Sequence, residues 1–120
     1  MSKDSETRHQ KSMLIQEHVF LHLKNLNNGF DSPSISYFSP AEFEIVLSRI
    51  KELGFGITGI EPWKDGDFYD VATFERTGKV PEDPHWYMSA FEKFQKMDDN
   101  LQYSASYSIP IGHPLLKKYS

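Results

Sequence analysis

Two histidines four residues apart, His18 and His22, come closest to a metal-binding pattern in this sequence. On a helix, this spacing lets two imidazoles reach one metal ion. A metal site needs a third and usually a fourth ligand, and His9, His85 and His113 fall in segments that have no reason to converge. We therefore interpret the pair as partly exposed helix residues, and we predict neither a metal site nor any other cofactor.

A group of carboxylates between residues 61 and 83 has the chemistry of a calcium ligand set or of a general acid. Its members are Glu61, Asp65, Asp67, Asp70 and Asp83. An EF-hand loop needs its later ligands and a terminal glutamate between two helices, whereas this group straddles a predicted hairpin. Aspartate and glycine are residue types that tight turns favour, so we interpret the group as structural. Asp70 is the exception, because it falls in the middle of a predicted strand.

Aromatic side chains at the start of a predicted helix are the remaining candidates for chemistry. His85 and Trp86, followed by Tyr87, can line a small-molecule pocket, which is the alternative function of this chain as a ligand-binding protein or enzyme. Such residues also fill protein cores. The sequence has no cysteine and no phosphate-binding loop. We therefore predict a non-catalytic module and keep the aromatic pocket as the alternative.

Composition narrows the class of partner. The chain has 120 residues and a net charge of −4, with acidic and basic residues mixed, so it offers no basic field for a nucleic-acid backbone. The polar N-terminus and the short apolar runs predict neither a signal peptide nor a membrane span. We expect a cytoplasmic protein whose partner is another protein or a second copy of this chain.

The stretch from Ser39 to Glu75 combines capping, periodicity and turn signals. Ser39 and Pro40 predict the start of a helix, apolar residues recur at helical spacing up to Leu53, and Gly54 supplies the left-handed residue that ends it. Residues 55–63 are rich in strand-forming types. Asp65-Gly66 is typical of a two-residue hairpin turn, so residues 68–74 are predicted to return as the antiparallel partner.

The flanking segments complete one predicted α+β domain over residues 12–110. We expect residues 1–11 to be disordered and residues 111–120 to form a tail in which Leu115 and Leu116 can fold back. The other predicted elements are a helix at 12–26, a strand at 34–38, a helix at 84–97 and a strand at 101–109.

From residue 34 onward the predicted order is strand, helix, strand, strand, helix, strand. This is the ferredoxin-like βαββαβ sandwich, with an additional N-terminal helix. Right-handed crossovers would place the first and third strands in the middle of the sheet. The additional helix can cover the other face of the sheet, lie at its edge or pack against a second copy.

RNA-recognition modules share this order, but their third strand carries basic and aromatic residues. No arginine or lysine falls between Gly66 and Phe74, where Asp67 and Asp70 stand instead. Nucleic acid is therefore an unlikely partner by this route.

Strict alternation places Phe68, Asp70 and Phe74 on one face of the strand predicted at 68–74. Ser104 and Ser106 fall on the corresponding neutral face of the last strand. If the N-terminal helix does not cover this face, these five residues form a contact surface. Two aromatic rings around one carboxylate favour a partner that presents apolar groups and an arginine or lysine.

Several short motifs resemble the B-type regulators of ribonuclease E activity. They are Gly29-Phe30-Asp31-Ser32-Pro33 after the first helix, Phe38-Ser39-Pro40-Ala41-Glu42-Phe43 at the next helix start, Leu53-Gly54-Phe55 at its end and Asp65-Gly66-Asp67 in the hairpin. The resemblance covers the layout from about Ser12 to Ile109. It implies a ferredoxin-like fold and a regulator that acts by binding another protein.

Overall fold

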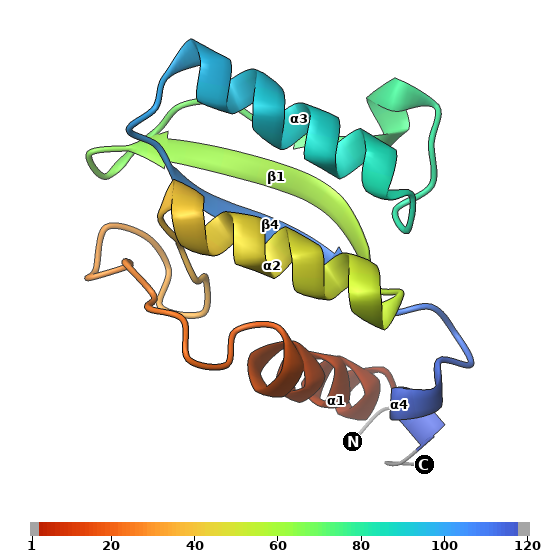
Figure 1. The fold of residues 1–120 in the computed structure, drawn as a ribbon. Coiled ribbons are helices and arrows are strands. Elements are labelled where there is room, and N and C mark those ends of the chain that lie inside the picture. Colours follow the sequence, from red (N-terminus) through yellow and green to blue (C-terminus); the bar gives the residue numbers. More distant parts are fainter. Residues whose placement is uncertain (1–2, 118–120) are drawn as a thin grey trace.

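A computed structural model describes the backbone of residues 3–117 and the side chains of residues 8–116 (Figure 1). The helices are α1 (Lys3–His18), α2 (Pro40–Leu53), α3 (Pro84–Met97) and α4 (Pro114–Lys117), with a 3₁₀ helix η1 at Phe74–Thr77. The strands are β1 (Gly56–Lys64), β2 (Asp67–Phe68), β3 (Ala72–Thr73) and β4 (Gln102–Ser108).

Local capping determines where the two central helices begin and end. The Ser39 hydroxyl accepts the backbone N–H of Glu42 at 3.3 Å, and Gly54 closes α2 with φ of 72°. The Asp83 carboxylate accepts the N–H of His85 at 2.9 Å at the start of α3. The predicted boundaries of both helices are confirmed, because each depends on contacts within a few residues.

The strands form a four-stranded antiparallel sheet around β1, which confirms the α+β class. β4 pairs with one edge of β1 from Gly56 to Trp63, and β2 and β3 pair in succession with the other edge. The ferredoxin-like strand order is not confirmed. That order places the second and fourth predicted strands at opposite edges of the sheet, whereas their counterparts here, β1 and β4, are neighbours.

The strand predicted at 34–38 is reduced to one bridge between Phe38 and Tyr103. Its backbone is used elsewhere: the N–H of Tyr37 donates to the Asn25 side chain at 2.9 Å, and the Tyr37 carbonyl accepts the N–H of Leu26 at 2.8 Å. Local loop contacts thus replace the ladder that would have made residues 34–38 a sheet strand.

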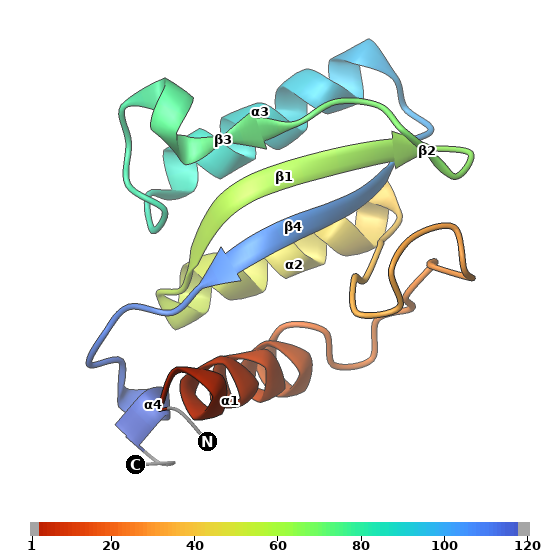
Figure 2. The ribbon, with the colours of Figure 1, turned by 180° about the vertical axis from the view of Figure 1, so that it is seen from behind.

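Helices α2 and α3 cover one face of the sheet, and the view from behind shows no helix over the opposite face (Figures 1 and 2). One cluster of buried side chains joins the helices to the sheet. It includes Val46, Ile50, Ile57, Ile60, Trp86, Phe91 and Tyr103.

Helix α1 lies alongside α2, on the side of the molecule where β4 runs (Figures 1 and 2). Leu14, Ile15 and Val19 are buried in the common core, and the Arg49 guanidinium of α2 donates to the carbonyls of Val19 and Leu21 at 2.8 and 2.7 Å. The N-terminal helix therefore extends the helical layer and leaves the opposite face of the sheet uncovered.

The ends of the chain differ from the prediction. α1 begins at Lys3 and ends at His18, whereas the sequence predicts a helix at 12–26 and disorder at 1–11. The helix stops because the carbonyls that follow it bind Arg49 and because His22 adopts a φ of 65°. Leu115 and Leu116 pack against the core through α4. Residues 1, 2 and 118–120 of the predicted terminal segments lie outside the described residues.

Candidate functional site

The uncovered face of the sheet is the candidate contact surface, and we call it the open face. It is defined by the side chains of Glu61, Thr73, Ser104 and Ser106, to which Trp63 and Phe68 are added at the hairpin end. Glu61 pairs with Ser104 across the strands, and Gly59 pairs with both Ser106 and Thr73. Cross-strand partners share a face, so these residues lie together.

A bulge in the return strand of the hairpin separates the residues predicted to share this surface. Trp63 pairs with Phe68 while Ile60 pairs with Ala72, so the return strand has one residue more than β1 over the same span. The Pro62 carbonyl accepts the N–H groups of two consecutive residues, 69 and 70, at 3.1 and 3.4 Å. One extra residue reverses the alternation beyond it.

The predicted grouping of Phe68, Asp70 and Phe74 on one strand face is therefore wrong. Phe68 lies at the hairpin end with 55% of its surface exposed, whereas Phe74 belongs to η1 and packs against the core. Asp70 lies in the bulge, where its carboxylate accepts the N–H of Val71 at 2.7 Å.

Ser104 and Ser106 do lie on the open face, but their surroundings differ. Ser104 is buried, and its hydroxyl donates to the Glu61 carbonyl at 3.3 Å. Ser106 is exposed, and its carbonyl accepts the Thr58 hydroxyl at 3.3 Å. Around them runs a shallow groove of about 360 Å³ whose charged lining residues are Glu61 and Glu75.

An aromatic cluster closes the hairpin end of the open face. The ring centroids of Phe30, Tyr37 and Phe68 lie 5.7, 5.4 and 6.4 Å from that of Trp63. Burial and a hydrogen bond to Asp31 raise the pKa of Tyr37. Phe30 and Trp63 are not among the site residues predicted from the sequence. The only signal was their position beside turns, which does not show that the loop before residue 37 reaches the hairpin.

The alternative site, predicted at His85 and Trp86, contains a cavity of about 450 Å³ between η1 and α3. Trp86 is buried in its wall and donates its indole N–H to the Ile57 carbonyl at 3.1 Å, while His85 is exposed at the rim. The charged residues of the lining are Arg76, Lys79 and Lys93.

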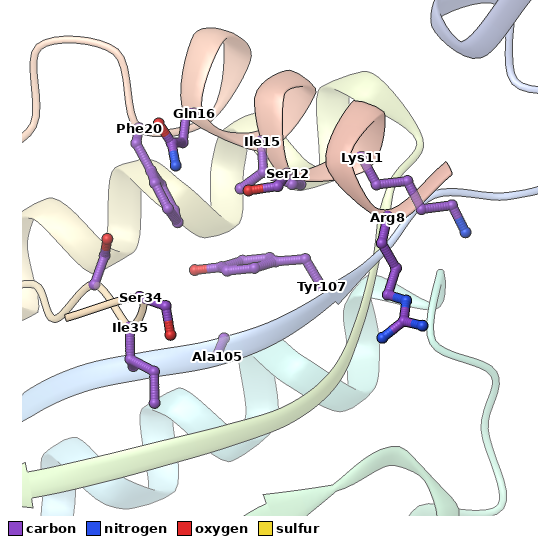
Figure 3. A pocket seen from close by; sticks show the side chains of 11 residues that line it. Arg8, Lys11, Ser12, Ile15, Gln16, Phe20, Ser34, Ile35, Ala105 and Tyr107 are labelled. Carbon is purple, nitrogen blue, oxygen red and sulfur yellow. The ribbon is translucent and has the colours of Figure 1, made fainter. Parts of the chain in front are cut away.

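A further cavity of about 310 Å³ separates α1 from residues 34–36 and β4. Figure 3 shows Arg8 and Lys11 together near one end, with the Tyr107 ring across the middle and Phe20 and Ser34 toward the other end. The Tyr107 hydroxyl is shielded from solvent and has no hydrogen-bond partner among the described residues. Burial raises its pKa.

Within residues 8–116, no three His, Asp or Glu side chains converge in a way that could hold a metal ion. The predicted helical pairing of His18 with His22 is wrong, because α1 ends at His18 and His22 lies in the turn beyond it. Two candidate binding surfaces stand out. The open face has carboxylates and aromatic rings, and the cavity between η1 and α3 has cations.

Comparisons with protein-family models, with curated proteins and with solved structures found no match. Among the described residues, no helix is long and apolar enough to cross a bilayer.

Proposed function

We propose that this chain is a non-catalytic binding module whose open face contacts a partner protein that presents basic and apolar side chains. The observation that carries the proposal is the exposed Phe68 ring, which stands against Trp63 at the edge of a sheet face that no described helix covers. Aromatic rings in such positions concentrate binding energy when a partner desolvates them.

The charges of the open face indicate the chemistry of the partner. The groove beside Ser104 has two carboxylates, Glu61 and Glu75, and no lysine or arginine in its lining. Asp65 and Asp67 add negative charge in the adjacent hairpin. An arginine or lysine that approaches this face meets complementary potential, which favours association and orients the partner.

Regulation of the bound partner, as the resemblance to the ribonuclease E regulators implies, and a cytoplasmic location belong to the same proposal. The proposal does not depend on a ferredoxin-like strand order. It depends on the one-sided placement of the helices, which leaves a polar sheet face with an aromatic end.

The test begins with a photo-crosslinking amino acid at Ser106, an exposed position on the open face, and the same residue at Lys51 on α2 as the control. A protein that crosslinks at position 106 but not at position 51 is then purified and titrated with variants. We expect Phe68→Ala to weaken its binding at least about tenfold, as for an aromatic hot spot. Crosslinking to a second copy of this chain would identify self-association.

Met97→Ala is the matched control, because Met97 is also an exposed apolar side chain, at 50%, but lies at the end of α3. It should leave binding unchanged. Both variants should melt near the wild-type temperature, whereas Phe74→Ala should melt lower because its ring packs against the core. Unchanged binding by Phe68→Ala, or equal losses in both variants, would contradict the proposal.

A further inference from the structure

The cavity between η1 and α3 concentrates positive charge in a protein of negative net charge. Arg76 and Lys79 approach it from η1 and the loop that follows, and Lys93 approaches from α3. His85 adds a titratable ring, and no carboxylate belongs to the lining. The chain as a whole has a net charge of −4, so three cations around one cavity are a local exception.

Within residues 8–116, none of these cations has a carboxylate partner in an ion pair. The ion pairs among residues with described side chains join Lys64 to Asp98 and Lys96 to Glu92, and neither includes a lysine or arginine of the cavity. Two nearby carboxylates are otherwise engaged, since Asp83 caps α3 through the N–H of His85 and Glu92 faces Lys96. Glu75, next to Arg76 in η1, lines the groove of the open face and not this cavity. The positive potential of the cavity is therefore available to a ligand.

The rest of the lining fits the organic part of a small molecule. Val71, Ala72 and Ala90 supply apolar surface, and the Trp86 indole offers only its ring because its N–H is bound to the Ile57 carbonyl. The volume of about 450 Å³ lies in the range of small-ligand sites. The cavity thus combines apolar lining residues with cations that come from both of its walls.

We propose that this cavity binds a phosphorylated small organic molecule, with its phosphate at Arg76, Lys79 and Lys93 and its apolar part against Ala72, Ala90 and Trp86. A guanidinium with two ammonium groups suits the charge of a phosphate monoester, which is close to −2 at neutral pH. The site goes beyond the protein-binding function proposed above and does not rest on it: Val71 and Thr73 border both the groove of the open face and this cavity, but the three cations and Trp86 line the cavity alone.

The competing cavity beside α1 is the less suitable of the two for such a ligand. It is smaller, at about 310 Å³, and its lining has two cations, Arg8 and Lys11, where the η1–α3 cavity has three. Substitutions can distinguish the two cavities, because no residue lines both.

The experiment titrates the protein with phenyl phosphate by isothermal calorimetry. Phenol and inorganic phosphate, which correspond to the apolar and charged parts of this probe, are titrated separately. We expect phenyl phosphate to bind with a Kd below about 1 mM and more tightly than either part. Arg76→Gln/Lys93→Gln removes one cation from each wall and should raise the Kd at least about tenfold. Added salt should weaken binding by the wild-type protein.

Lys24→Gln/Lys51→Gln removes the same charge from exposed positions outside the cavity and should bind like the wild type. Arg8→Gln/Lys11→Gln should also leave the Kd unchanged. The proposal is overturned if phenyl phosphate fails to bind below about 1 mM, if phenol binds as tightly, if the Lys24/Lys51 control loses as much affinity, or if the α1 variant is the one that loses binding.

Discussion

At the scale of single residues, Gly56 at the start of β1 is the glycine with the least room for a side chain. A Cβ atom there would lie 2.5 Å from Ser108 Oγ, 2.7 Å from Glu82 Oε2 and 2.9 Å from the Pro81 Cβ. The neighbouring N–H of Ile57 donates to the Pro81 carbonyl at 3.0 Å, so that loop is held in place. The absence of a side chain lets the loop before α3 pack directly on the strand.

We expect Gly56→Ala to lower the free energy of unfolding by about 1–3 kcal/mol, because the added methyl group displaces packed neighbours. Urea denaturation measures the loss. Gly59→Ala is the matched control in the same strand, since its Cβ would meet its nearest neighbour, the Ala72 carbonyl oxygen, at an ordinary 3.5 Å. Equal losses in the two variants would show that crowding at position 56 does not account for the effect.

At the scale of elements, the sequence predicts what local chemistry controls. Ser39, Gly54 and Asp83 determine helix ends through hydrogen bonds within their own turns, and the hairpin turn follows from Asp65 and Gly66, which adopt φ of 51° and 83°. These features agree with the structure because no distant contact is needed to specify them.

The bulges could not be predicted in the same way. β1 contains one beside Thr58, where its pairing with β4 shifts register between Ile57 and Gly59. Simple alternation places Ile57 and Ile60 on opposite faces, yet both are buried under the helices. Neither this bulge nor the one in the return strand has a residue type that marks it, so alternation assigned Phe74 to the wrong surface.

Trp86 links α3 to β1 beside the first of these bulges. Its indole N–H donates to the Ile57 carbonyl at 3.1 Å from a fully buried position. Trp86→Phe leaves that carbonyl without its donor and removes part of the ring, so we expect a loss of about 2–4 kcal/mol in unfolding free energy. Guanidinium denaturation gives the value.

Trp63→Phe is the control for Trp86→Phe. The Trp63 indole nitrogen is also shielded from solvent, but it has no hydrogen-bond partner among the described residues, so this substitution removes ring volume without breaking a hydrogen bond. A smaller loss than for Trp86→Phe is expected. Equal losses would mean that the bond to Ile57 contributes little to the attachment of α3.

At the scale of the whole molecule, the one-sided placement of the helices separates the two proposed sites except at β3 and the residue before it, where Thr73 and Val71 border both. The open face is the side of the sheet without helices, and the cationic cavity lies between η1 and α3. The strand order that produces this arrangement depends on long-range pairing of β1 with β4, to which the sequence gives no local guide. The cavity likewise could be predicted only through His85 and Trp86, because its cations come from segments that the fold brings together.

Buried tyrosines give the whole molecule a defined response to alkaline pH. Burial raises the pKa of Tyr87 and of Tyr103 to about 12, and it also raises that of Tyr107. The hydroxyls of all three lack hydrogen-bond partners among the residues that the structure describes. Each neutral phenol is therefore favoured by folding, whereas in the unfolded chain it ionises near pH 10.

A raised pKa contributes stability that is fully present below the unfolded-state value and is lost as the pH rises. We expect the unfolding free energy to change little through these groups up to about pH 9 and to fall between about pH 10 and 12, with tyrosinate absorbance appearing together with the loss of circular dichroism. Tyr103→Phe removes one such group, so the alkaline fall should become shallower while stability at pH 7 stays equal or rises, because the lost hydroxyl has no partner. Full tyrosinate formation near pH 10 in a protein that keeps its circular dichroism would show that solvent reaches these rings.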